Sequence, residues 1–392
     1  MTIVARTRSR LIACALATIA IAAACGSDSS AGPGGTNRSY FMGFSDFPPA
    51  PDTALLRRTV QMWNTRADAA IMHIDPPWAA LLAGGDADSL VVADVLPLRL
   101  AYAQQLNKVV VIETDVTNGI DRTSESPALV TLGRSITEDT VQRLYRRWVR
   151  SLDSIADPDF LGLASETNLI RAAASPAVYA AVVKMTNDAA ADVHTIQRSF
   201  LYVSVQAEVA WGRLAGPAGT FVGVDRDRAD FPFIDMLGVS SYPYLGGFTD
   251  PSQMPDDYYS RLRGSPALLL MVTEGGWSSA NVGAVRSSPT LQEAWIERAA
   301  ILLDNAHALA WFQLDFTDIN LVAFGLPADD PQLAPFVYIG LVDTALTPKP
   351  ALAQWDKVFA RTRVSDLPCA GGCLSSIHGL AGNYRSEHAQ RP

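Results

Sequence analysis

Eight short segments of apolar, β-prone residues recur along this chain of 392 residues and constrain its fold more than any other feature. Several are nearly continuous apolar runs, such as Val109–Ile112 and Leu268–Met271. Such runs are typical of parallel strands that are buried on both faces. The predicted strands are Tyr40–Ser45, Ala69–Ile74, Lys108–Thr114, Phe160–Ser165, Leu201–Gln206, Met236–Ser241, Leu268–Thr273 and Ala310–Asp315.

Helix-like stretches lie between these strands. The starts of successive strands are 29 to 52 residues apart, which leaves room for a loop, a helix and a return. Eight such units predict an α/β fold, namely a single-domain (β/α)8 TIM barrel over residues 39–362, followed by a tail over 363–392. A doubly wound open sheet is the alternative, disfavoured because no glycine-rich phosphate loop follows the first strand. The expected helices are Thr53–Arg66, Val91–Leu106, Thr137–Ile155, Pro176–Ser199, Leu291–Asn305 and a closing helix Ala351–Ala360.

The N-terminal segment reads as an export signal. Three arginines precede the apolar run Leu11–Ala24, which is too short to span a bilayer comfortably and ends at Cys25. This arrangement resembles a bacterial lipoprotein signal over residues 1–24, and the resemblance implies that Cys25 is lipidated and tethers the chain to a membrane. An ordinary signal peptide is the other interpretation. Residues 25–38 are rich in Gly, Ser and Asp and predict a flexible linker.

Composition excludes some partners. The net charge of −9 disfavours nucleic acid, because phosphate binding requires a basic surface. Cys369 and Cys373 in the tail favour a local disulfide over a metal site, because no His or Cys accompanies them at zinc spacing. We expect no metal and no cofactor.

The residues that end the predicted strands carry the chemistry, because the carboxyl ends of the strands form the active-site face of a barrel. These ends are acidic and aromatic, with amides and hydroxyls. Lysine and cysteine are absent from them, which excludes Schiff-base and thiol chemistry. Aromatic faces stack on the C–H patches of sugar rings, and two carboxylates can cleave a glycosidic bond.

Two of the strand ends resemble motifs of retaining barrel glycosidases. The run from Val272 to Ser279, with Glu274 followed by Gly275-Gly276-Trp277, is similar to the nucleophile motif of β-1,3-glucanases. The run Leu163–Asn168 resembles the acid/base motif of the same superfamily, with Ser165 in the place of its usual Asn, and the run Gly238–Tyr244 is similar to a strand-six motif of endo-β-1,4-galactanases. The resemblance implies a retaining hydrolase of β-linked polysaccharides or oligosaccharides, with Glu166 as general acid/base and Glu274 as nucleophile.

Further strand-end residues are expected to bind the carbohydrate. They are Asp75, Trp78, Glu113, Asn168, Glu208, Trp211, Tyr242, Tyr244, Trp277, Trp311 and Asp315. Glu113 and Glu208 could instead orient other polar groups, and Trp277 and Trp311 could pack in the core. His73 could contact the substrate or have a structural role.

A retaining mechanism also predicts the geometry of the catalytic pair. The two carboxyl groups should lie about 5–5.5 Å apart. Glu274 should be ionised, with a hydrogen bond from Tyr242, and the pKa of Glu166 should be raised. A barrel that binds glycans without cleaving them remains an alternative, as does a hydrolase of non-sugar substrates.

Overall fold

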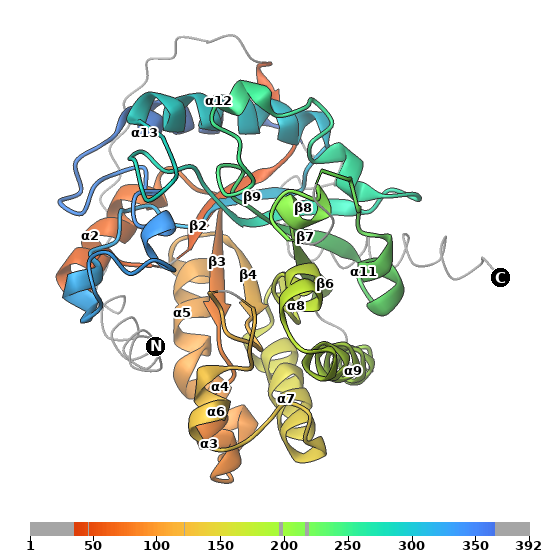
Figure 1. Ribbon diagram of the computed structural model, residues 1–392. Coiled ribbons are helices and arrows are strands. Elements are labelled where there is room, and N and C mark those ends of the chain that lie inside the picture. Colours follow the sequence, from red (N-terminus) through yellow and green to blue (C-terminus); the bar gives the residue numbers. More distant parts are fainter. Residues whose placement is uncertain (1–34, 46, 121, 196–198, 216–218, 365–392) are drawn as a thin grey trace.

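The computed structural model describes residues 35–45, 47–120, 122–195, 199–215 and 219–364. Eight parallel strands form a closed barrel in chain order, with helices around it (Figure 1). The barrel strands are β2 (Phe41–Ser45), β3 (Ala69–Ile74), β4 (Val109–Thr114), β5 (Phe160–Gly162), β6 (Phe200–Gln206), β7 (Met236–Ser241), β8 (Leu269–Gly275) and β9 (Ala310–Gln313). The predicted (β/α)8 barrel is confirmed. Cys25, Cys369 and Cys373 lie outside the described residues.

The outer helices begin where the sequence supplies capping groups. Asp52, Ser175 and Ser288 accept backbone N–H groups at the starts of α2, α9 and α12, and proline opens the latter two. The helices are α2 (Thr53–Asn64), α3 (Trp78–Leu82), α4 (Ala87–Asp94), α5 (Leu96–Leu100), α6 (Pro127–Thr131), α7 (Asp139–Ser151), α8 (Thr167–Ala173), α9 (Pro176–Val193), α10 (Ala207–Ala210), α11 (Asp225–Asp230), α12 (Pro289–Asn305) and α13 (Pro350–Phe359).

Two connections differ from the prediction. The helix expected over Val91–Leu106 is divided into α4, α5 and a π-helical turn, Ala101–Gln105, because Pro97 cannot donate to the preceding turn and starts a new helix. Between β7 and β8 the chain forms only the 3-10 turns Pro251–Gln253 and Ser260–Arg263.

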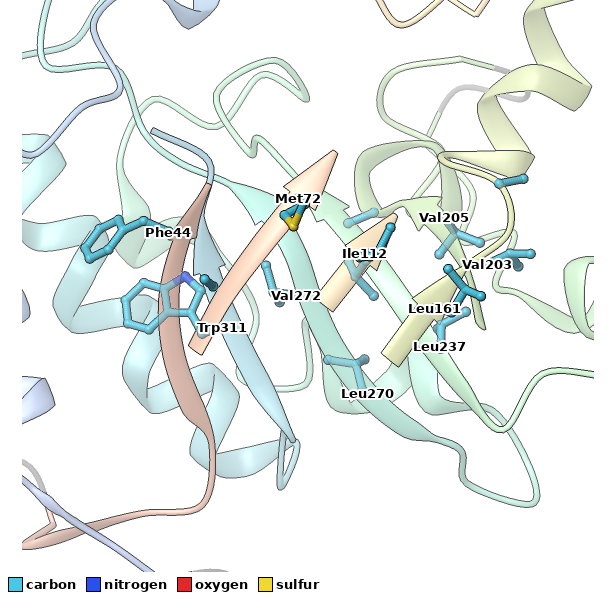
Figure 2. Close-up of a cluster of buried hydrophobic side chains, with 14 of the residues drawn as sticks. Phe44, Met72, Ile112, Leu161, Val203, Val205, Leu237, Leu270, Val272 and Trp311 are labelled. Atoms are coloured by element: carbon cyan, nitrogen blue, oxygen red, sulfur yellow. The ribbon is translucent and has the colours of Figure 1, made fainter. Parts of the chain in front are cut away.

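The alternation of side chains along the strands builds two apolar layers. Residues such as Ile71, Val111 and Met271 point into the barrel. Their neighbours, among them Met72, Ile112 and Val272, point outward against the helices (Figure 2). Both faces of the sheet are therefore buried, which is why the strands read as continuous apolar runs.

The amino-terminal end of the barrel is closed by the ends of the described chain. The short strands β1 (Asn37–Arg38) and β10 (Thr362–Arg363) pair in parallel. Asn37 and Arg38 were expected to end the linker, and Arg363 was expected to begin the tail. In the structure these residues pair in the ladder.

Candidate active site

A cavity of about 320 Å³ opens at the carboxyl ends of the barrel strands. Glu166 and Glu274 both line it, although 108 positions separate them in the sequence. Asp75, Tyr242 and Asp315 line the same cavity. The barrel thus gathers five of the predicted site residues at one mouth, as expected for this fold.

A β-bulge turns Glu274 into the cavity. Val272 pairs with Val239 and Glu274 pairs with Ser240, so Thr273 is an extra residue on β8. Met271 points into the barrel, and strict alternation would therefore direct Glu274 outward. The bulge reverses that alternation and directs the carboxylate to the mouth.

A left-handed backbone conformation positions Glu166. Its φ of 49° is unusual for a residue other than glycine. Its backbone N–H donates to Ser204 Oγ at 2.9 Å, and α8 begins at the next residue. The side chain of Glu166 lines the cavity.

Ser240 joins the two carboxyl groups. Its Oγ lies 2.6 Å from Oε1 of Glu166 and 2.8 Å from Oε1 of Glu274. The two Oε1 atoms can therefore be no more than about 5.4 Å apart. This limit agrees with the separation of about 5–5.5 Å that retaining enzymes use.

The two contacts of Ser240 require a shared proton. A serine hydroxyl has one hydrogen and can donate to only one of the carboxyl oxygens. The other contact is a hydrogen bond only if that carboxyl group is protonated and donates to Ser240 Oγ. Burial, together with the charges of Glu166 and Glu113, raises the pKa of Glu274 to about 8. Glu274 therefore holds the shared proton at neutral pH.

Arg122 fixes Glu166 from the opposite side. Its Nε donates to Glu166 Oε2 at 2.9 Å, and its Nη1 donates to Asp115. Arg122 is itself buried; burial alone would lower its pKa, but Asp115 and Glu166 outweigh this effect and raise it.

The expectation that Glu274 is ionised is contradicted for the unliganded site, because burial and the neighbouring carboxylates raise its pKa. The guanidinium of Arg122 forms an ion pair with Glu166. Ser240, and not Tyr242 as expected, is hydrogen-bonded to Glu274. Tyr242 lies in the cavity, where burial and the charge of Glu274 raise its pKa.

The predicted tryptophan platforms need correction. Trp78, Trp277 and Trp311 are at most 1% exposed and lie in the hydrophobic core. Trp78 packs near Tyr145, and Trp277 donates to Ser287. Trp211 stacks on Tyr258 and donates to its carbonyl. None of these four side chains lines the cavity.

Four predicted polar residues support the site from behind the cavity. Glu113 accepts from Ser204 at 2.7 Å and from Tyr202 at 3.0 Å, and burial raises its pKa. Because Ser204 also accepts the N–H of Glu166, Glu113 helps to hold the backbone of Glu166 in place.

The other three residues, Asn168, Glu208 and Tyr244, also form hydrogen bonds to protein groups. Both ends of the Asn168 amide bond the backbone of Gln206, and Glu208 accepts from Tyr258 at 2.6 Å and from the N–H of Tyr242. Tyr244 donates to Pro335 O. These residues position the loops and do not line the cavity.

Two site residues were not predicted. Arg122 lies in the loop after β4, where nothing in the sequence distinguishes it from a surface arginine. Ser240 ends a predicted strand, so its position gave a signal, but its role depends on the bulge opposite it. His73, left open by the sequence, lines the cavity with Nε2 3.9 Å from Glu274 Oε2.

Comparison with known proteins identifies similar folds. No family model matches the chain, and no curated protein matches it. A solved exo-β-1,4-mannosidase from Opitutaceae bacterium strain TAV5 is 13% identical, with a TM-score of 0.58, over 85% of this chain and 63% of that one. Xylanase 10B from Thermotoga maritima is 13% identical, with a TM-score of 0.55, over 82% and 95% of the two chains.

Further similar structures include larger enzymes. A β-glucuronidase from an uncultured Clostridium species is 12% identical, with a TM-score of 0.52, over 83% of this chain. The chain spans about half the length of that enzyme. At identities of 12% and 13%, the similarity of these structures to the chain shows the fold alone.

In the part of the chain that the structure describes, no helix is long and apolar enough to cross a membrane. No group of three or more His, Cys, Asp or Glu side chains in the same ranges is arranged to hold a metal ion.

Proposed function

We propose that this chain is a retaining glycoside hydrolase that cleaves a β-linked glycosidic bond by double displacement. The observation that carries the proposal is the pair Glu166 and Glu274, joined through Ser240 in a cavity at the carboxyl face of the barrel. The names of the similar structures, which include a xylanase and a mannosidase, support a glycan-cleaving hydrolase.

The reaction needs opposite protonation states at the two carboxyl groups. In the first step, Glu166 gives its proton to the glycosidic oxygen while the carboxylate of Glu274 attacks C1 and the leaving group departs. In the second step, Glu166 takes a proton from water, which attacks C1 and releases Glu274. The limit of about 5.4 Å on the separation of the two Oε1 atoms is below the roughly 6.5–9.5 Å by which inverting enzymes admit a water.

Ser240 supplies the route by which the resting state becomes the reactive state. Glu274 gives its proton to Ser240 Oγ as Ser240 gives its own proton to Glu166 Oε1. The number of protons on the pair is unchanged, and Glu274 is left ionised as the nucleophile. Arg122 can follow this change, because Asp115 still pairs with it when Glu166 is protonated.

Covalent trapping tests the assignment. A panel of aryl β-glycosides first identifies a sugar that is turned over, and the matching 2-deoxy-2-fluoro glycoside then accumulates the glycosyl-enzyme. Mass spectrometry should locate the label on Glu274. A label on Glu166 would exchange the two roles, and NMR detection of an inverted first-formed anomer would refute the retaining mechanism.

Substitution tests whether the pair is catalytic at all. Glu166→Gln and Glu274→Gln should each lower kcat by roughly 10²–10⁴-fold, the range for a positioned acid, base or nucleophile. Glu297→Gln on the exposed side of α12 is the matched control and should leave kcat unchanged. Binding of glycans without turnover by the unsubstituted protein would favour a glycan-binding role.

We further propose that the protein is exported and attached to a bacterial membrane or cell surface through lipidated Cys25. The apolar run that ends at this cysteine, and the polar linker after it, support the proposal. Cys25→Ala should release the protein from the membrane fraction. Persistent membrane fractionation of the variant would contradict the proposal.

A further inference from the structure

The cavity has an apolar wall that the chemistry of Glu166 and Glu274 does not use. The segment after β9 supplies most of it. Its side chains lining the cavity include Leu314, Ile319, Leu321, Phe324, Leu333 and Phe336. All but Leu321 are only partly buried, so they present apolar surface to the cavity and are not wholly covered by the core.

Aromatic contacts join this wall to the catalytic floor. The ring of Phe336 meets the ring of Tyr242 edge-on, with centroids 4.9 Å apart. The ring of Phe324 lies 5.7 Å from that of Phe47, which follows β2. The wall is thus continuous with the site and is not a separate surface patch.

The opposite side of the cavity is apolar as well. Ile120, Leu169, Leu214 and Leu245 come from the loops and helix that follow β4, β5, β6 and β7. Leu214 is 40% exposed, so it presents apolar surface to solvent. Aliphatic groups therefore flank the polar floor on both sides.

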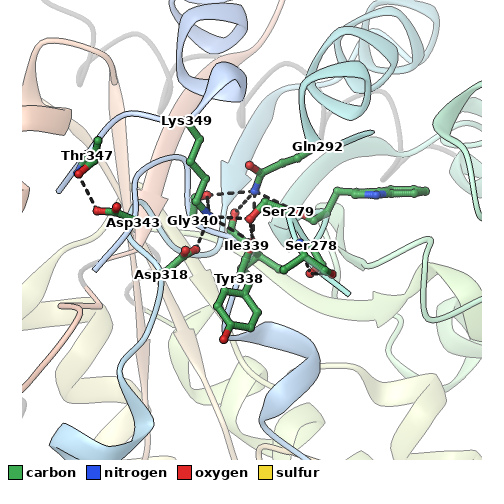
Figure 3. A network of polar contacts seen from close by, with 12 residues as sticks. Ser278, Ser279, Gln292, Asp318, Tyr338, Ile339, Gly340, Asp343, Thr347 and Lys349 are labelled. Carbon is green, nitrogen blue, oxygen red and sulfur yellow. Dashed lines mark hydrogen bonds and ion pairs between the residues drawn. The ribbon is translucent and has the colours of Figure 1, made fainter. Parts of the chain in front are cut away.

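The segment that carries the wall is fixed at its base. Lys349 Nζ forms an ion pair with Asp318 and donates to Gly340 O at 2.9 Å, while Gln292 Nε2 donates to Ile339 O and Gly340 O at 3.0 Å (Figure 3). These bonds hold the segment where it leaves the barrel and where it returns. The wall is therefore held in place before a ligand binds, which lowers the entropic cost of binding.

Polar side chains line only part of the cavity. Besides Glu166 and Glu274 they are Ser45, His73, Asp75, Asp115, Thr117, Arg122, Ser126, Ser165, Gln206, Tyr242 and Asp315. Hydroxyl groups that reached the apolar walls would lie against leucine and phenylalanine, and burying a hydroxyl without a hydrogen bond is costly. Among the described residues no tryptophan lines the cavity, although indole faces are well suited to sugar rings.

Because polar side chains and apolar walls line different parts of the cavity, we propose that the substrate is a single β-linked sugar on an apolar leaving group, such as an alkyl, aryl or isoprenoid alcohol. The inference rests on the proposed hydrolase function. The polar floor holds the sugar, and the walls formed by Phe324, Leu333 and Leu214 hold the apolar group.

A series of leaving groups with equal chemistry tests the proposal. Once the aryl glycoside panel gives the sugar, methyl, hexyl and octyl β-glycosides of that sugar are compared below their micellar concentrations. The longer alcohols leave with nearly the same ease, so a rise in kcat/KM reports contact with the apolar chain. We expect at least a tenfold rise from methyl to octyl, and a larger kcat/KM for octyl than for the β-linked disaccharide of that sugar.

Variants locate the effect. Leu333→Ser and Phe324→Ser should each reduce the octyl-to-methyl ratio of kcat/KM by severalfold. Val322→Ser is the matched control, because Val322 lies in the same segment, is 63% exposed and does not line the cavity. It should leave the ratio unchanged.

The outcomes separate the two proposals. Turnover with no dependence on chain length, or a preference for the disaccharide, overturns the apolar leaving group and leaves the hydrolase standing. A ratio that falls equally in the Val322→Ser control also overturns it. Absence of turnover on every aryl and alkyl glycoside overturns the hydrolase function and this inference with it.

Discussion

At the scale of single residues, Ser240 couples the two carboxyl groups that we propose to be catalytic. Because Ser240 contacts both Glu166 and Glu274, the apparent pKa values belong to the pair and not to either side chain. Burial and the charges of Glu166 and Glu113 raise the pKa of Glu274 to about 8. Above that pH this proton is lost, and no acid remains for the leaving group.

This coupling predicts an alkaline decline in activity. We expect kcat/KM to be level near neutral pH and to fall above an apparent pKa near 8. In Ser240→Ala the decline should move to lower pH, since the hydrogen bonds from Glu274 to Ser240 and from Ser240 to Glu166 stabilise the pair with its proton. The same variant should lose kcat, because the proton route is removed. The measurement is the pH profile of kcat/KM; a profile that keeps rising beyond pH 9 would contradict the shared proton.

At the scale of elements, a close approach between strands fixes the residues beneath the cavity. A Cβ on Gly162 of β5 would lie 2.6 Å from the ring of Tyr202, and one on Gly238 of β7 would lie 2.8 Å from it. The ring of Tyr202 therefore fills the space that these glycines leave, and its hydroxyl reaches Glu113. Neither strand can have a larger residue at this level of the barrel.

Gly162→Ala is expected to destabilise the barrel by about 1–3 kcal/mol, because Tyr202 cannot move without disturbing the layer around it. Urea denaturation of the variant and of Gly35→Ala gives the comparison. A Cβ on Gly35 meets nothing closer than 3.8 Å, so this control should change the free energy of unfolding by less than about 0.5 kcal/mol. Equal midpoints for the two variants would show that the close approach carries no cost.

The sequence predicted the strands well because burial on both faces makes them recognisable, and strand ends located Glu166 and Glu274 because the barrel directs them to one mouth. It could not predict which aromatic rings reach the cavity. Trp277 lies three positions after Glu274, yet the chain turns its indole into the core. Arg122 and the bulge at Thr273 were also beyond prediction, since they depend on loop and strand geometry that residue types do not reveal.

At the scale of the whole molecule, the cavity and the paired chain ends lie at opposite ends of the barrel. The cavity with Glu166 and Glu274 lies at the carboxyl ends of the strands, and the β1–β10 ladder lies at the amino-terminal ends. There, buried Arg38 pairs with Asp68 at 2.9 Å, and its guanidinium lies 5.0 Å from the ring centre of Phe359. One side chain thus links the first described strand to the final helix.

This separation predicts that Arg38→Met lowers stability and spares activity. The substitution removes the arginine nearer to Asp68 and a donor to the carbonyls of Tyr40 and Phe359, so the free energy of unfolding should fall by about 2–3 kcal/mol. Arg57→Met, on the exposed side of α2, is the matched control and should stay within about 0.5 kcal/mol. Well below the unfolding transition, both variants should retain the kcat of the unsubstituted protein on the aryl glycoside that it cleaves. Loss of kcat in Arg38→Met under these conditions would mean that the closed end of the barrel also sets the geometry of Glu166 and Glu274.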